Sequence, residues 1–181
     1  SSGLRIQSPS DGPADYAIAN RMATYQASLE RLSIDTQTNR SLVQTADVGI
    51  DAIIKDLQKI RTLALESMSS SLTTSDRKAN QTEVTSLLAD ITSIANTTFF
   101  NAKSLLNGTY AQGKSSLIFQ VGANTGNYIT LNIRSMQSSA LGLGSIAVST
   151  ITTATTALAK IDSAVTIATS QAASVGSVDE R

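Results

Sequence analysis

A heptad pattern in residues 18–64 limits what this chain can fold into more than any other feature of its sequence. Apolar residues recur there at alternating intervals of four and three. A repeat of about 3.5 residues kept over this length is typical of a long helix whose narrow apolar seam packs against other helices. All seam positions except Thr36 and Asn39 are apolar: Ile18, Met22, Tyr25, Leu29, Leu32, Thr36, Asn39, Val43, Ala46, Ile50, Ile53, Leu57, Ile60 and Ala64.

The boundaries of this helix follow from proline and from a Ser/Thr cluster. We predict an extended entry over residues 1–12 and a helix over 13–67, because proline is tolerated in a first helical turn. At about 1.5 Å per residue this helix is roughly 80 Å long, so it cannot fold on itself. Thr74 or Ser75 is the expected cap of a second helix over 76–98, which turns back along the first.

A β-hairpin and a third helix complete the predicted elements. Residues 117–121 and 128–133 alternate in polarity around the turn sequence GANTGN, which predicts a hairpin within a loop region over 99–148. The heptad then returns over 149–176, at Ile151, Ala154, Leu158, Ile161, Val165, Ala168, Ala172 and Val175. This third helix is the expected partner of the first. The centre of the predicted seam joins Ile50, Ile53, Leu57 and Ile60 to Leu158, Ile161 and Val165.

The predicted fold class is therefore mainly α. We expect an elongated bundle of long antiparallel helices with coiled-coil-like packing and a small β-hairpin region, forming a single domain over residues 1–181. Leu63 does not fit this seam, because it falls on the charged side of the first helix between Lys59 and Glu66. A leucine in that position raises the question of which surface covers it.

Composition argues against most other classes of function. Lys plus Arg and Asp plus Glu both number 14, so no net charge attracts nucleic acid or an anionic membrane. The chain has no Cys and no His, which removes the commonest metal ligands, thiol nucleophiles and general base. No stretch approaches the ~20 apolar residues of a membrane helix. We expect no enzyme, no cofactor, no metal and no membrane insertion.

Several stretches together carry a family resemblance over nearly the whole chain. They are SSGLRIQSPSDGPADYAIANRM, ADVGIDAIIKDLQKIRTLALES, SIANTTFFNAKSLLNG, LIFQVGANTGNYITLNI and LAKIDSAVTIATSQAASVGSVDER. In this order they resemble bacterial flagellins, whose N-terminal region has an S-S-G-L-R-I run followed by S-x-D-x-P-A and A-I-A. The resemblance implies the flagellin rod core, with two N-terminal helices, a hairpin region and one returning C-terminal helix.

The resemblance also implies a function. We expect a structural subunit of the flagellar filament, extracellular and exported by flagellar type III secretion, which assembles with other flagellin subunits to give motility. In flagellins, one segment that lines the filament tube precedes the stretch matching Ser1, and another follows the stretch matching Arg181. We therefore expect this chain to be a processed core or fragment that is monomeric. A flagellin-like surface adhesin and a hook–filament junction protein are the alternative hypotheses.

Finally, the resemblance assigns a contact surface to the charged side of the first helix. Lys59, Leu63 and Glu66 match an Arg, a Leu and a Gln of the family pattern, and Glu83 matches a Glu. In flagellins this surface packs between protofilaments and is recognised by Toll-like receptor five. Leu63 and Glu83 keep the family's residue type. Lys59 loses the planar fork of Arg and Glu66 adds a charge, so we expect weaker recognition by the receptor.

Overall fold

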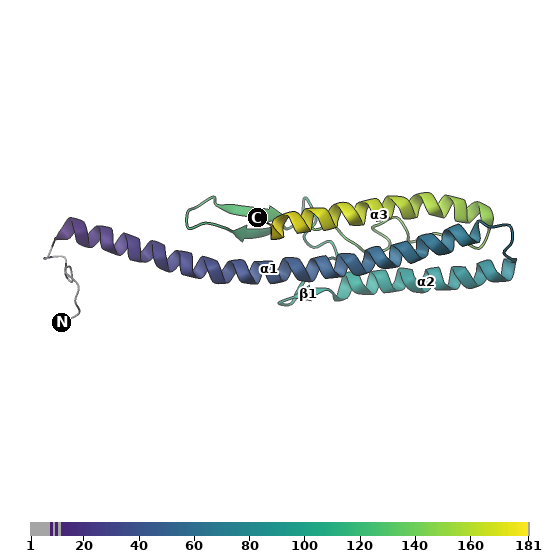
Figure 1. Cartoon of the computed structure of the whole chain (residues 1–181), viewed down its shortest axis with the longest axis horizontal. Coiled ribbons are helices and arrows are strands. Elements are labelled where there is room, and N and C mark those ends of the chain that lie inside the picture. The colour runs from purple at the N-terminus through teal and green to yellow at the C-terminus, as the bar shows by residue number, and fades with distance from the viewer. Residues whose placement is uncertain (1–7, 9, 11, 181) are drawn as a thin grey trace. The chain divides into compact units, whose positions relative to one another are not determined.

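The computed structural model describes residues 8, 10 and 12–180 and consists mainly of helix (Figure 1). The elements, in chain order, are α1 (Pro13–Ser67), α2 (Thr74–Thr97), β1 (Phe99–Phe100), β2 (Lys103–Ser104), β3 (Leu117–Gln120), β4 (Tyr128–Leu131) and α3 (Ile151–Asp179). Strands β1 and β2 form one antiparallel pair, and β3 and β4 form a second two-stranded sheet. The predicted mainly α class with a small β region is confirmed.

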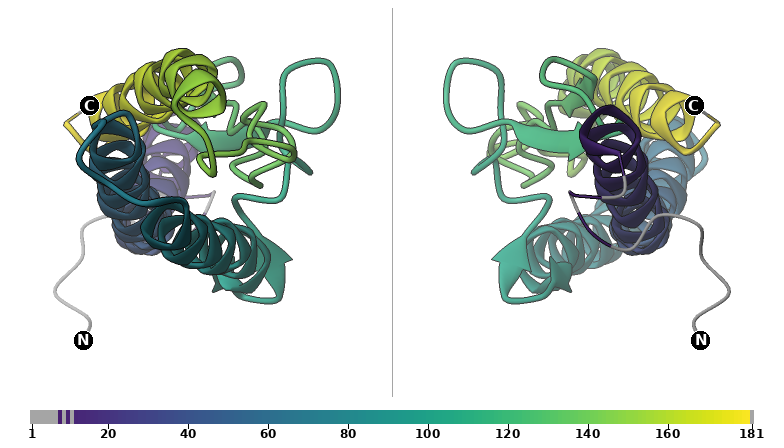
Figure 2. Two further views of the ribbon diagram at one scale, coloured as in Figure 1. Left: turned by 90° about the vertical axis from the view of Figure 1, so that its right-hand side faces the viewer. Right: turned by 90° about the vertical axis from the view of Figure 1, so that its left-hand side faces the viewer.

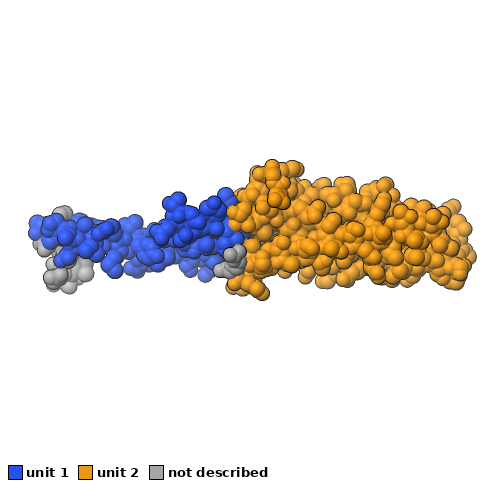
Figure 3. Space-filling view, turned by 90° about the horizontal axis from the view of Figure 1, so that it is seen from above, with its two compact units in different colours: residues 1–39, 118–129 blue, residues 40–117, 130–181 orange. Residues whose placement is uncertain are grey.

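The chain divides into two compact units, which Figure 3 colours separately. Unit 1 comprises Ser1–Asn39 and Ile118–Ile129, so it holds the first part of α1 and the end of the β3–β4 hairpin. Unit 2 comprises Arg40–Leu117 and Thr130–Arg181. The single elongated domain over residues 1–181 stays a prediction.

In unit 2, α2 and α3 both run beside residues 40–67 of α1 (Figures 1 and 2). Two ion pairs fix the direction of α3. Arg61 Nε lies 2.7 Å from Asp162 Oδ1, and Arg40 Nε lies 3.0 Å from Asp179 Oδ1. Because the earlier residue of α1 meets the later residue of α3, the two helices are antiparallel. Residues 105–116 and 132–150, here called the irregular region, occupy the side between α2 and α3 (Figure 2).

The core of unit 2 combines the predicted seam with side chains that the heptad pattern did not include. Ile50, Ile53, Leu57 and Ile60 of α1 are fully buried. The irregular region adds several large apolar side chains with no solvent exposure: Leu105, Leu106, Ile133, Met136 and Leu143. The segment before α3, predicted only as loop, is therefore a layer of the core.

The buried row of α3 differs in part from the predicted one. Ile161 is fully buried, but Leu158 and Val165 are only half-buried. The deepest row is Ala154, Ala157, Ile161, Ala164, Ala168, Gln171 and Val175. This helix serves two neighbours, because Asp162 pairs with α1 while the Gln171 amide bonds the Asn132 carbonyl at 3.1 Å. The most buried side chains of α3 therefore lie between the side of the helix that faces α1 and the side that faces the irregular region.

Side-chain caps determine where the second and third helices begin. Thr73 caps α2, and its capping box with Asp76 joins the Thr73 hydroxyl to the Asp76 backbone N–H at 3.2 Å. The expected caps were Thr74 or Ser75, but only Thr73 places Asp76 at the third helical position that a capping box needs. Thr150 caps α3 in the same way, with Thr153 as its reciprocal partner.

Unit 1 pairs part of one helix with the end of one hairpin. Within this hairpin end, Phe119 of β3 is buried, whereas Ile118 and Gln120 on either side of it are exposed, which is the alternation expected of a strand. The helix differs from the prediction, because its seam positions Ile18, Met22, Tyr25 and Leu29 are exposed. Within the described residues, no helix combines the length and apolarity that a membrane crossing requires.

Candidate functional site

The four residues of the predicted contact surface lie on α1 and α2 in unit 2. Lys59 and Glu66 are exposed on α1, Glu83 is exposed on α2, and Leu63 is half-buried. Lys59 Nζ lies 3.4 Å from Asp56 Oδ1, one turn away on the same helix. Lys59, Leu63 and Glu66 follow at intervals of four and three, so they share one face of α1.

Contacts between α1 and α2 show how Glu83 relates to this face. The Asn80 amide nitrogen of α2 donates to the Ser67 hydroxyl of α1 at 3.1 Å. Leu63 precedes Ser67 by one turn, and Glu83 follows Asn80 by one turn. Because α2 runs antiparallel to α1, a step of one turn back along α1 and a step of one turn forward along α2 lead in the same direction from this contact. Leu63 and Glu83 therefore belong to one end of the α1–α2 pair.

A second α1–α2 contact lies further along the same pair. A Cβ added to Gly49 would be 2.9 Å from Thr98 Oγ1 and 2.8 Å from Leu106 Cδ1. The glycine lets the side chains of Thr98 and Leu106 pack directly against the backbone of α1, because it has no Cβ to exclude them. The two helices are thus held together at both ends of their overlap, with the contact surface at the Ser67 end.

The predicted contact surface combines one apolar side chain with three charged ones. Leu63 is half-buried, whereas Lys59, Glu66 and Glu83 are exposed. Each charged group is solvent-exposed, so none is held in the low-dielectric setting that prepares an acid or base for catalysis. Among the described residues, no group of His, Cys, Asp and Glu side chains forms a metal site.

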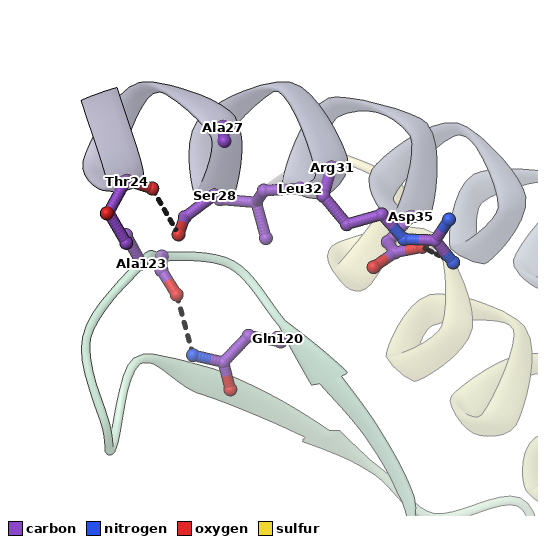
Figure 4. A pocket seen from close by; sticks show the side chains of 9 residues that line it. Thr24, Ala27, Ser28, Arg31, Leu32, Asp35, Gln120 and Ala123 are labelled. Carbon is purple, nitrogen blue, oxygen red and sulfur yellow. Dashed lines mark hydrogen bonds and ion pairs between the residues drawn. The ribbon is translucent and has the colours of Figure 1, made fainter. Parts of the chain in front are cut away.

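Unit 1 contains a groove between α1 and the hairpin end (Figure 4). Its polar groups bond to each other: the Ser28 hydroxyl donates to the Thr24 carbonyl at 2.8 Å, and Arg31 pairs with Asp35 at 3.1 Å. The Gln120 amide donates to the Gly122 carbonyl at 2.6 Å. These bonds all join residues that are close in sequence, which is typical of an ordinary helix surface and turn rather than of a catalytic site.

Sequence reasoning missed two features of α1 and α2. The first is the exposed apolar row of unit 1, which the heptad pattern assigned to a buried seam. The second is Arg77, a cationic side chain of α2 that is only 8% exposed. Nothing in the heptad pattern distinguishes Arg77 from a solvated arginine, since its partners are the backbone carbonyls of Ser67, the last residue of α1, and of Ser69 in the turn that follows.

Residues 1–111 match the family model described as the bacterial flagellin N-terminal helical region. The chain belongs to the flagellin family. It is 35% identical over 144 residues to polar flagellin F of Vibrio parahaemolyticus, covering 80% of the chain and 37% of that relative. It is 36% identical over 159 residues to flagellin of Bacillus subtilis, covering 81% of the chain and 52% of that relative. The chain thus spans about half the length, or less, of these flagellins.

Solved structures show the same architecture. The crystal structure of Bacillus cereus flagellin matches with a TM-score of 0.71 at 27% identity, covering 81% of this chain and 82% of that one. A putative flagellar hook-associated protein from Vibrio parahaemolyticus matches with a TM-score of 0.74 at 14% identity, covering 96% and 90%. The second likeness shows the fold alone. Sequence identity is higher with the flagellin.

Proposed function

We propose that this protein is a structural subunit of the bacterial flagellar filament, and that it serves motility rather than catalysis. The observation that carries the proposal is the flagellin family match over residues 1–111, together with relatives named flagellin at 35% and 36% identity. The proposed location is accordingly the extracellular filament, reached by flagellar type III secretion. The proposed partners are other flagellin subunits.

The contact surface is the proposed site of subunit contact. Leu63 supplies apolar area that another subunit covers, and Lys59, Glu66 and Glu83 form the rim that favours an oppositely charged neighbour. The same four residues are the proposed footprint of Toll-like receptor five. The 181-residue chain alone is proposed to be a monomer, which sedimentation equilibrium checks.

Electron microscopy of the source bacterium tests the filament role. Deleting the gene should remove the filaments, and restoring it should return them, because the subunit is the building material. Intact filaments after deletion contradict the proposal and favour the surface-adhesin alternative. Filament length and swimming speed are measured on the same cells.

A matched pair of substitutions tests the contact surface. Leu63→Asp should leave the isolated chain folded by circular dichroism, but the same change in the gene of the source bacterium should impair filament formation, because it places a charge at the apolar centre of the contact surface. Leu63→Ala is the control for loss of side-chain volume without added charge. Normal filaments in the Leu63→Asp strain would show that subunits do not meet at this surface.

A hook–filament junction protein is the second candidate, because the putative hook-associated protein has the same fold. The two roles differ in where the protein lies along the flagellum. Immunogold labelling along the whole filament supports the filament subunit. Labelling confined to one short zone between hook and filament supports the junction protein instead.

A further inference from the structure

Arg77 is unusual because it is a cationic side chain buried at the junction of two helices. Only 8% of the residue is exposed. Its guanidinium donates to the Ser67 carbonyl at 2.9 Å and to the Ser69 carbonyl at 2.7 Å. Arginine is rarely buried unless its donors are satisfied. Here the hydrogen bonds go to backbone oxygens at the end of α1.

The position of these carbonyls explains how a buried cation is tolerated. The last carbonyls of a helix have no partner within the helix and carry partial negative charge. Ser67 is the last residue of α1, and the Ser69 N–H bonds back to the Glu66 carbonyl at 2.9 Å, which extends the helix end by a tight turn. Arg77 therefore caps α1 with a side chain supplied by α2.

Asn80 adds a second contact to the same place. Its amide nitrogen donates to the hydroxyl of Ser67, a residue with no solvent exposure. Arg77 and Asn80 are three residues apart, so they lie on one face of α2. We call Ser67, Ser69, Arg77 and Asn80 the clasp. Because its bonds end on both the backbone and the side chain of Ser67, the clasp restrains both sliding and rotation of α2 on α1.

The clasp is one helical turn from the contact surface on both helices. Leu63 lies on the face of α1 that carries Ser67, and Glu83 lies on the face of α2 that carries Asn80. A rotation of α2 about its own axis moves Glu83 relative to Leu63, although each helix stays intact. The alignment of the surface across the two helices consequently depends on the clasp.

We propose that Arg77 is a positioning residue for the contact surface, holding α2 in the register that presents Glu83 beside Leu63. This inference rests on the proposed function of that surface, but the clasp itself is defined by its own bonds. Loss of Arg77 leaves two helix-end carbonyls without their donor, and α2 then loses its unique setting on α1.

Spin-label distances test the register directly, because the chain has no cysteine and labels can be placed at will. Thr62→Cys and Ser86→Cys place labels on exposed sites of α1 and α2. A second pair, Lys55→Cys and Ser170→Cys, reports on α1 and α3 as the control. Distances are measured by pulsed electron paramagnetic resonance in the wild-type background and in Arg77→Met.

Arg77→Met should replace the single narrow α1–α2 distance with a shifted or broadened distribution, while the α1–α3 distance stays unchanged. Arg77→Lys should restore the wild-type distance only in part, since one ammonium cannot reproduce the fork that bridges two carbonyls. An unchanged α1–α2 distance in folded Arg77→Met overturns the proposal. If Arg77→Met fails to fold, Asn80→Ala and Arg77→Lys decide: broadening in either supports the clasp, and wild-type distances in both overturn it.

Filament formation in the source bacterium, scored for each variant, separates this proposal from the proposed function. With both correct, Arg77→Met and Leu63→Asp each impair assembly, but only Arg77→Met changes the α1–α2 distance. If Leu63→Asp assembles normally while Arg77→Met changes the distance, the contact surface is wrong and the clasp stands. If Leu63→Asp blocks assembly and Arg77→Met leaves the distance unchanged, the surface stands and the positioning role fails.

Discussion

The two units contain parts of one heptad pattern with opposite outcomes. In unit 2, Ile50, Ile53, Leu57 and Ile60 have no solvent exposure. In unit 1 the equivalent seam positions are 43–68% exposed, at Ile18, Met22, Tyr25 and Leu29. The residue types and spacing are alike, and what differs is the presence of α2, α3 and the irregular region beside the helix. A heptad indicates a face suited to packing, whereas its burial depends on the surrounding elements.

The largest expected difference between the units comes from one added charge. Ile60→Asp places a carboxylate in the unit 2 core and should lower the free energy of unfolding by about 4 kcal/mol or more. Met22→Asp makes a comparable change on the exposed row of unit 1 and should alter it by about 0.5 kcal/mol or less. Urea unfolding followed by circular dichroism measures both. Equal losses would mean that the two rows are buried alike.

A methyl group at two helical glycines gives a smaller contrast within unit 2. Gly49→Ala puts a Cβ within 3 Å of side-chain atoms of Leu106 and Thr98. The resulting overpacking should lower the free energy of unfolding by about 1–3 kcal/mol, which outweighs the gain of about 1 kcal/mol from the higher helix propensity of alanine. Gly176→Ala on α3 meets no atom within 4 Å and should raise stability by up to about 1 kcal/mol. Thermal unfolding should therefore shift in opposite directions. A stabilising Gly49→Ala would show that α1 and α2 are not closely packed there.

Acid should weaken the start of α2 within unit 2. Hydrogen bonds from the Thr73 hydroxyl and backbone N–H hold the pKa of Asp76 below its ordinary value. A carboxyl whose pKa is lowered by folding contributes stability above its unfolded pKa, and this contribution is lost as the pH falls through the folded pKa. Asp76→Asn should flatten the pH dependence of unfolding below about pH 4. An unchanged acid profile in this variant would exclude the capping box as its source.

The smallest expected effect concerns the ion pair that closes the α1–α3 side of unit 2. Arg61 and Asp162 are 44% and 48% exposed, so their contact is worth about 0.2–1 kcal/mol. A double-mutant cycle with Arg61→Ala and Asp162→Ala measures the coupling. It should shrink in 1 M salt, because the Debye length then falls to about 3 Å. A coupling above this range that ignores salt would indicate a buried pair.

Local sequence patterns predicted many of the helices and turns. The predicted helix over 13–67 coincides in its bounds with α1, and GANTGN lies between β3 and β4. The start of α2 depends on which threonine can exchange bonds with Asp76, which spacing alone left open. The buried row of α3 departs from the predicted heptad in part, because Gln171 turns inward to bond the Asn132 carbonyl just after β4. These two residues are 39 positions apart in the sequence. Long-range side-chain bonds of this kind have no periodic signal.

The same limit applies to the candidate site. The four residues of the contact surface follow from family resemblance, and their role stays a prediction. The proposed position of Glu83 relative to Leu63 depends on Arg77. The residues around Arg77 in the sequence give no sign that this side chain is buried. The irregular region illustrates the point again, because Met136 and Leu143 are fully buried although they lie outside any strand or helix. Their burial follows from the packing of the helices around them.

Amide hydrogen exchange along α1, resolved by residue with nuclear magnetic resonance, tests the contrast between the units most directly. Exchange reports local opening, which is rare in a packed core and frequent where few apolar contacts hold a helix. Slow exchange over residues 43–64 and fast exchange over residues 18–29 is the expected result. Equal protection of the two segments would contradict the account, because it would show that one heptad has one environment throughout.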